Sequence, residues 1–241
     1  MRRLLALVSL AACGSPAAAP DAASPADAPP ADAAVDAPAG FGTLGGMCGV
    51  LAEMQLTETT PELFRDTFTF AREFVDPDDR PLLTAGGRRL LEVPNAGGSS
   101  QLSEAFAFEE LARCETAGLL KTETEIVYDT QGKITDLEVT MLGHKIGVSV
   151  TRAFAFPLGT PYTVEQATPL ITRKLQDILV SSANVSAEDR WDKQILAVMA
   201  YDTQAADVVD QVWQGLDASV RADTLVVVSV TEGADTFIYS N

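Results

Sequence analysis

Residues 14–40 have a composition that cannot form a folded core, so any core must lie elsewhere in the chain. Of these 27 residues, 12 are Ala, 6 are Pro and 4 are Asp. Pro interrupts helices, Ala buries little apolar area, and Asp keeps the segment solvated. We therefore expect a semi-rigid tether followed by one domain over residues 41–241. The chain is 46% hydrophobic, which is enough for such a domain to bury a core.

The first 13 residues, MRRLLALVSLAAC, have the pattern of a secretion signal. Two basic residues precede a short apolar run, Leu4–Leu10, which is far shorter than the roughly 20 residues that a membrane-spanning helix needs. The sequence Leu10-Ala11-Ala12-Cys13 resembles the bacterial lipobox. That resemblance implies cleavage of a signal peptide, residues 1–12, acylation of Cys13, and a lipid-anchored tether over residues 13–40. Gly14, in place of the Asp that retains many such lipoproteins in the inner membrane, favours the outer membrane.

Cys48 and Cys114 remain once Cys13 is assigned to lipid. An even pair of cysteines in an oxidising compartment predicts a disulfide, here closing a loop of 66 residues. The alternative is two separate buried thiols. Two cysteines and the single histidine, His144, cannot form a standard structural zinc site. His144 lies in the sequence Gly143-His144-Lys145, which we interpret as a solvated turn.

The sequence divides the domain into an irregular part, residues 41–99, and a regular core, residues 100–241. In the first part we expect short helices at Gly49–Met54 and after Thr60-Pro61, with four phenylalanines as apolar anchors: Phe64, Phe68, Phe70 and Phe74. Turns are expected at residues 76–79 and 95–98. The second part begins with an amphipathic helix over residues 101–116.

The remaining core pattern predicts an α/β (α+β) domain. Three strands are expected at Leu120–Tyr128, Ile134–Leu142 and Ile146–Ala153. A helix is expected within 164–181, and either Thr163 with Gln166 or Thr168 can cap its start. A strand at Gln194–Tyr201 and a helix capped by Asp202 or Thr203 should follow. The domain should end with a strand at Thr224–Thr231 and a short strand at Phe237–Tyr239. The order α-β-β-β-α-β-α-β predicts a mixed sheet with helices on both faces.

One face of the predicted strands gathers polar residues. Asp136, Glu138 and Thr140 alternate with apolar residues in one strand, and Gly147, Ser149 and Thr151 alternate in the next. The simple interpretation is the solvent-exposed face of a sheet. The alternative is a ligand or metal site.

This arrangement resembles the core of the PD-(D/E)XK, or restriction-endonuclease-like, superfamily. The resemblance covers roughly residues 100–201, and it implies a helix acid, Glu104 or Glu109, and a strand acid, Asp136, holding Mg²⁺, with Asp136 and Glu104 as metal candidates. The third-strand motif, acid-x-Lys, is replaced by Ser149-Val150-Thr151. The implied site is therefore degenerate, with Asp136, Glu138, Glu104, Glu109, Ser149 and Thr151 as its candidate residues.

The charge of the chain argues against nucleic-acid partners. The formal net charge is -17 and the pI is about 4.3, whereas binding to a phosphate backbone depends on clustered Lys and Arg. We expect an envelope lipoprotein whose non-catalytic domain binds a protein or envelope ligand or has a structural role, and which needs no cofactor. The alternative is a divergent metal-dependent nuclease or phosphodiesterase, for which Mg²⁺ would be required.

Overall fold

The computed structural model describes residues 39–95 and 100–240. Contacts divide the chain into two units, Met1–Ala33 and Ala34–Asn241, and every described residue belongs to the second. The predicted leader, the lipidation site Cys13 and the tether up to residue 38 lie outside the described residues, as do Ala96 to Ser99.

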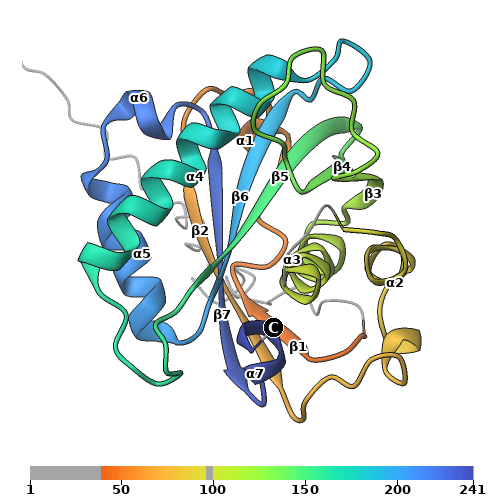
Figure 1. Ribbon diagram of the computed structural model, residues 1–241, viewed down its shortest axis with the longest axis vertical. Coiled ribbons are helices and arrows are strands. Elements are labelled where there is room, and N and C mark those ends of the chain that lie inside the picture. The colour runs from red at the N-terminus through yellow and green to blue at the C-terminus, as the bar shows by residue number, and fades with distance from the viewer. Residues whose placement is uncertain (1–38, 96–99, 241) are drawn as a thin grey trace, which may run out of the picture. The chain divides into compact units, whose positions relative to one another are not determined.

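The described strands form one mixed sheet of seven strands, in the order β1-β2-β7-β6-β5-β4-β3 (Figure 1). The strands β2, β7, β6 and β5 run parallel in its centre, and the antiparallel strands β1, β4 and β3 complete its two sides. Their bounds are β1 Thr43–Gly46, β2 Leu63–Phe70, β3 Gly118–Thr122, β4 Leu137–Met141, β5 His144–Ala153, β6 Lys193–Ala200 and β7 Leu225–Gly233. This confirms the predicted α/β class.

Helices cover both faces of the sheet (Figure 1). One apolar core lies between the sheet and α3, α2 and α7, and the other lies between the sheet and α4 and α5. The helices are α1 Glu53–Thr57, α2 Ala85–Glu92, α3 Gln101–Cys114, α4 Val164–Asn184, α5 Thr203–Gly215, α6 Ala218–Arg221 and α7 Thr236–Tyr239, with a 3₁₀ turn, η2, at Arg80–Leu82. No helix among the described residues is both long and apolar enough to cross a membrane.

The expectation of an irregular segment over residues 41–99 is wrong for most of its described part. The helix expected after Thr60-Pro61 is instead β2, a strand in the parallel centre of the sheet, which pairs with β7 on one side and β1 on the other. The four predicted phenylalanine anchors are buried. The helix expected at Gly49–Met54 forms slightly later, as α1.

Two further strand predictions require correction. The strand expected over Leu120–Tyr128 ends at Thr122, because Glu125 turns back to accept hydrogen bonds from the Thr122 backbone and hydroxyl. The strand expected at Phe237–Tyr239 is the one-turn helix α7. Both edges of β7 are already paired, with β2 and β6, so a returning strand has no edge beside β7 to join.

The expected helix over 101–116 is confirmed as α3, but it is not amphipathic. Eleven of its 14 residues are buried, including three glutamates and Arg113. The helix therefore passes through the domain with almost no solvent-facing side. As buried carboxyl groups need partners, α3 determines where the polar chemistry of this domain lies.

Candidate functional site

The structure separates the candidate residues into two groups on opposite sides of the sheet. Glu104 and Glu109 belong to α3, which packs on the same face as Leu137, Val139 and Val148. Glu138, Ser149 and Thr151 alternate with these residues and therefore point to the opposite face. Asp136 lies at the boundary, just before β4 begins.

Asp136 and Glu104 line one small cavity of about 10 Å³. Its other walls come from α2 and the chain after it, from the end of β3 and from the following turn; they are Leu90, Val93, Pro94, Asn95, Thr122 and Glu123. A cavity of this size holds about one water molecule. The convergence of Asp136 with Glu104 matches the resemblance. The predicted partner Ser149 is not part of the lining.

One oxygen of the Asp136 carboxylate is hydrogen bonded to the backbone of β5. Its Oδ2 atom accepts a hydrogen bond of 2.6 Å from the Val150 amide. Lys174 of α4 donates to the carbonyl of the same residue, Val150, at 2.8 Å. Burial raises the pKa of Asp136, while the Lys174 charge and the Val150 amide oppose that rise. A lysine thus lies close to the strand acid, although the third-strand motif lacks one.

Glu104 is 5% exposed and has an unusual protonation equilibrium. Burial, together with the negative charges of Asp136 and Glu123, raises the pKa of Glu104 to about 7, against the opposing hydrogen bonds from Ser100 and Asn95. The side chain therefore carries a proton in about half of the molecules near neutral pH.

The arrangement does not fit the Mg²⁺ site implied by the resemblance. Mg²⁺ needs octahedral oxygen ligands and normally keeps several waters, but the cavity has room for about one. One Asp136 oxygen is held by the Val150 amide, and Glu104 is partly protonated at neutral pH. Among residues 39–95 and 100–240, no group of three or more His, Cys, Asp or Glu side chains has a metal-binding arrangement.

The polar sheet face is buried, which contradicts its interpretation as a solvent-exposed surface. Glu138 is fully buried, and Ser149 and Thr151 are at most 9% exposed. The Trp191 ring covers Gly147, where an added Cβ would lie 2.7 Å from the ring. Ser149 hydrogen bonds to Thr135 at 3.1 Å, and Glu138 pairs with Lys145 at 3.2 Å. Ser149 and Glu138 therefore have structural partners, and none of Glu138, Ser149 and Thr151 lines the cavity.

Two other candidates also have structural partners. Glu109 accepts hydrogen bonds from the Thr84 amide and hydroxyl, at 2.8 and 2.5 Å, and so holds the residue that caps α2. His144 is not in the turn, which is formed by Leu142 and Gly143, but opens β5. Hydrogen bonds to Glu53 and to Asp192 raise the pKa of His144.

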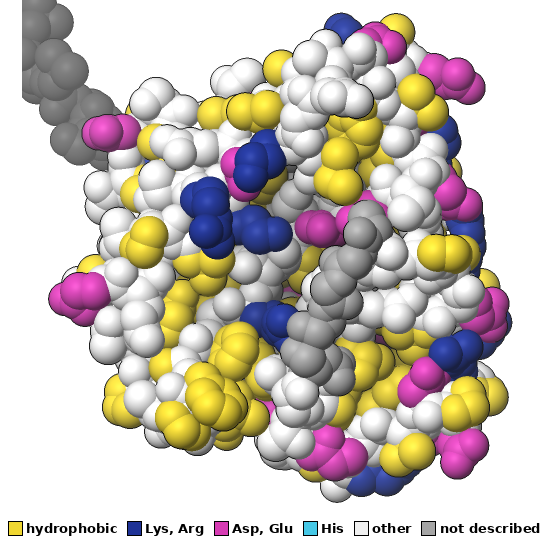
Figure 2. Space-filling view, viewed as in Figure 1, with side chains coloured by type: hydrophobic (Ala, Val, Ile, Leu, Met, Phe, Trp, Pro, Cys, Tyr) yellow, Lys and Arg dark blue, Asp and Glu magenta, His cyan; other side chains and the backbone are white. Residues whose placement is uncertain are grey.

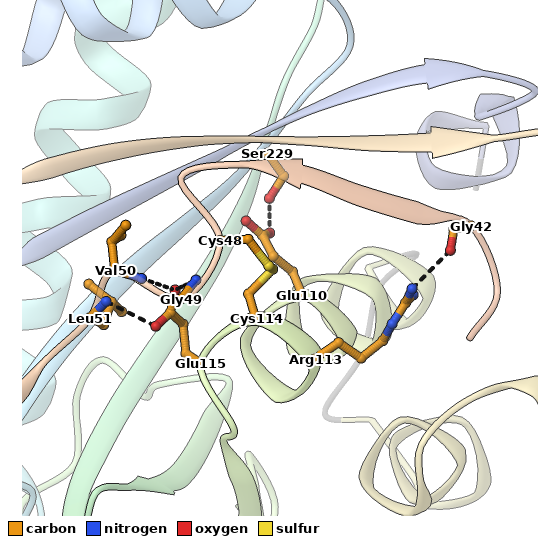
Figure 3. The surroundings of a disulfide bond; sticks show 10 residues. All are labelled: Gly42, Cys48, Gly49, Val50, Leu51, Glu110, Arg113, Cys114, Glu115 and Ser229. Carbon is orange, nitrogen blue, oxygen red and sulfur yellow. Dashed lines mark hydrogen bonds between the residues drawn. A yellow bond between two sulfur atoms is a disulfide. The ribbon is translucent and has the colours of Figure 1, made fainter. Parts of the chain in front are cut away.

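The predicted disulfide is confirmed. Cys48 and Cys114 are bonded, and the bond attaches the chain between β1 and α1 to the C-terminal end of α3 (Figure 3). The neighbouring Glu115 accepts hydrogen bonds from three successive amides of that segment, those of Gly49, Val50 and Leu51.

Sequence reasoning missed two features. Lys174 is one polar residue among several on α4, and no local pattern distinguishes it. The carboxyl groups of Asp66 and Glu110 lie close together in the core, and only the alternation of β2 could have indicated that Asp66 points inward.

A hollow of about 430 Å³ lies at the carboxyl ends of β6 and β7. Its lining residues are Tyr201, Asp202, Thr203, Gln204, Thr231, Glu232, Gly233 and Asp235.

Comparisons with known proteins leave the family open. No family model matches the chain. The AAC-rich mRNA clone AAC4 protein of Dictyostelium discoideum is 41% identical over 154 residues, which are 61% of this chain and 22% of that protein. The structure of Pyrococcus furiosus SfsA in complex with Ca²⁺ is similar over 58% of this chain and 69% of that one, with a TM-score of 0.28 and 11% identity. The chain spans about a fifth of the first protein, and the likeness to the second is too weak to assign a fold or a ligand.

Proposed function

We propose that this chain is a lipid-anchored protein of the bacterial cell envelope, attached through Cys13 and favouring the outer membrane. The lipobox-like residues Leu10 to Cys13 are the basis of the proposal. The Cys48–Cys114 disulfide supports it, because such bonds persist in oxidising compartments and are rare in the cytosol.

The α/β domain in this proposal binds a protein or envelope ligand or has a structural role, and does not catalyse a reaction. The observation that carries it is the closed site: Asp136 is bound by the Val150 amide beside a cavity of about 10 Å³. A substrate has no room there beside Glu104 and Asp136. The acidic net charge also disfavours a nucleic-acid partner.

Metabolic labelling with palmitate tests the anchor. The wild-type chain should incorporate label and fractionate with the outer membrane, and Cys13→Ser should lose the label. Ser24→Ala, a matched change within the tether, should keep it. Gly14→Asp should move the labelled protein toward the inner membrane. Label that persists in Cys13→Ser would refute the anchor.

A second candidate is a divergent metal-dependent phosphodiesterase, and two observations favour it. Asp136 lines the cavity with Glu104 and is within range of the Lys174 charge, although the third-strand motif is missing. Lys and Arg side chains also gather near the middle of the face shown in Figure 2. A local basic region on an acidic protein suits a phosphate group.

Two measurements separate these candidates. The first measurement is a thermal-shift titration with Mg²⁺, Mn²⁺ and Ca²⁺. If the domain only binds a partner, these ions should leave its melting temperature unchanged; if it is the metal-dependent enzyme, the bound metal should raise the melting temperature. Hydrolysis of a phosphodiester substrate should be absent. If hydrolysis occurs, is lost in Asp136→Asn and survives in the exposed control Asp129→Asn, the enzyme candidate is correct and the binding proposal fails.

A further inference from the structure

Two carboxyl groups lie against each other in the core below the disulfide. Asp66 of β2 is 3% exposed and Glu110 of α3 is 1% exposed, and the two carboxyl groups are close enough for each to shift the pKa of the other. Ser229, the strand partner of Asp66, donates its hydroxyl to Glu110 Oε2. Asp66 Oδ1 and Glu110 Oε1 are buried and have no hydrogen-bond partner among the described residues. Two neighbouring carboxyl groups can hydrogen bond only when one carries a proton, so we infer that this pair shares one.

The pair lies next to the chain segment that follows β1, which we call the strap, residues Met47–Leu51. Gly46 is opposite Asp66 in the β1–β2 ladder, and a Cβ added to Gly46 would lie 2.9 Å from the Asp66 Cα. One helical turn after Glu110, α3 holds the strap through the disulfide and, at the next residue, through Glu115 (Figure 3). The strap therefore contacts both elements that the carboxyl pair joins.

The charges that act on the pair are negative. Glu110 experiences the charges of Asp66 and Glu115, and within residues 39–95 and 100–240 no cation opposes them. Arg65 of β2 pairs with Asp207 of α5, and Arg113 of α3 donates to the carbonyls of Phe41 and Gly42. From β7 the pair meets the hydroxyl of Ser229, and β1, with the sequence Thr-Leu-Gly-Gly, has no titratable side chain.

We propose that Asp66 and Glu110 form a proton-operated latch on the strap. With the shared proton, the pair joins β2 to α3 below the strap. Without the proton, two carboxylates repel each other in a buried space, and the strap loosens while the parallel strands stay folded.

The direction of the pH dependence follows from burial. Burial raises the pKa of both Asp66 and Glu110, and their mutual repulsion adds to the rise for Glu110. A carboxyl group with a raised pKa in the folded state stabilises that state at acid pH, and this contribution is lost as the pH rises through the folded-state pKa. The latch therefore holds in acid and releases toward neutral and alkaline pH.

Amide hydrogen exchange on the disulfide-bonded domain tests the latch. After correction for the intrinsic exchange rate, the opening constant of the Gly49, Val50 and Leu51 amides should rise with pH, by up to about tenfold per pH unit for one proton. The Val198 amide in β6 should not follow this rise. A pH-independent strap in the wild-type protein would overturn the proposal.

Two variants place a permanent hydrogen donor in the pair. In Glu110→Gln the amide oxygen can still accept from Ser229, and the amide NH₂ donates to Asp66, so the pH dependence of strap opening should disappear. Asp66→Asn places the donor on the other partner and should act alike, which provides a second test if either variant folds poorly. Glu92→Gln removes an exposed carboxylate and should keep the wild-type slope. A slope that survives in both Glu110→Gln and Asp66→Asn would show that another group controls the strap.

Discussion

Glu104 is the residue whose protonation is most open to measurement. It lies on the buried helix α3 beside Asp136, and its pKa is raised to about 7. Because the folded-state pKa is higher than the ordinary value of 4.5, the stabilising contribution of Glu104 is complete below pH 4.5 and is lost as the pH rises through 7. Above that pH the protein keeps a buried negative charge next to another one.

Glu104→Gln should therefore stabilise the protein at pH 8, by up to about 3 kcal/mol, and leave its stability at pH 4 nearly unchanged. Urea denaturation at the two pH values measures this. Glu92→Gln, on the exposed end of α2, should have little effect at either pH. Equal stability of Glu104→Gln and wild type at pH 8 would contradict the raised pKa.

The resemblance left the helix acid open as Glu104 or Glu109, and the structure places Glu104 beside Asp136. The resemblance did not predict Lys174, which reaches Val150 from another element, or the burial of Glu138 and Ser149. Alternation in a strand shows which residues share a face. It does not show whether a distant loop, here the one carrying Trp191, covers that face.

Among the elements, α4 has the clearest start signal in the sequence. Two cap residues were possible, and the structure selects Thr163: its hydroxyl accepts from the Gln166 amide, and the Gln166 side chain accepts from the Thr163 amide. Thr168 instead lies within the helix and donates to the Val164 carbonyl.

Thr163→Ala should destabilise the domain by about 1 kcal/mol, because an N-cap oxygen is lost. Thr168→Ala serves as the matched control and should be neutral or slightly stabilising, since Ala is the better helix former at an exposed position. Chemical denaturation of both variants measures the difference. Equal losses in the two variants would show that the cap does not determine where α4 begins.

The disulfide attaches the strap to α3, and its removal tests that link. The Cys48→Ala/Cys114→Ala double variant should lose about 4 kcal/mol, the chain-entropy value for a loop of 66 residues. Denaturation of this variant against oxidised wild type measures the loss. Reductant should destabilise the wild type by a similar amount and leave the variant unaffected; an unchanged stability in the variant would contradict the prediction.

The strand β2 shows why one element was assigned wrongly. Its sequence, Leu-Phe-Arg-Asp-Thr-Phe-Thr-Phe, has buried residues at every second position. One of these is Asp66, and a charged residue at an inward position hides the alternation. Thr60-Pro61 just before it has the form of a helix start, so local signals favoured a helix. The segment forms a strand because it pairs with β7, which lies more than 150 residues further along the chain.

At the scale of the whole molecule, the buried acids determine how stability depends on pH. In the part of the chain that the structure describes, burial is the largest cause of a raised pKa at seven carboxyl groups: Asp66, Glu104, Glu109, Glu110, Glu115, Asp136 and Asp235. Each of them favours the folded state in acid and loses that contribution as the pH rises. Arg72 lowers the pKa of Asp79 to about 2, and Arg89 lowers that of Glu125, so these two groups act in the opposite sense at low pH.

The melting temperature should therefore be highest in mildly acidic solution and fall from pH 5 to pH 8.5. Differential scanning calorimetry across this range measures it. Glu104→Gln/Glu110→Gln should flatten the decline, and the exposed pair Asp129→Asn/Glu92→Gln should not. A melting temperature that rises from pH 5 to pH 8.5 would contradict the sum of these shifts.

By itself, the sequence indicated the α/β class, the order of the longer elements from α3 to β7, the cap candidates and the pairing of Cys48 with Cys114, because these depend on local periodicity, turn chemistry and residue counts. The tertiary structure alone decided that β2 joins the sheet centre, that the polar strand face is covered, and that the glutamates of α3 are buried. These outcomes depend on contacts between residues far apart in the chain. Burial then raises the pKa of Glu104 and Glu110, so these two acids titrate above the ordinary range of a carboxyl group.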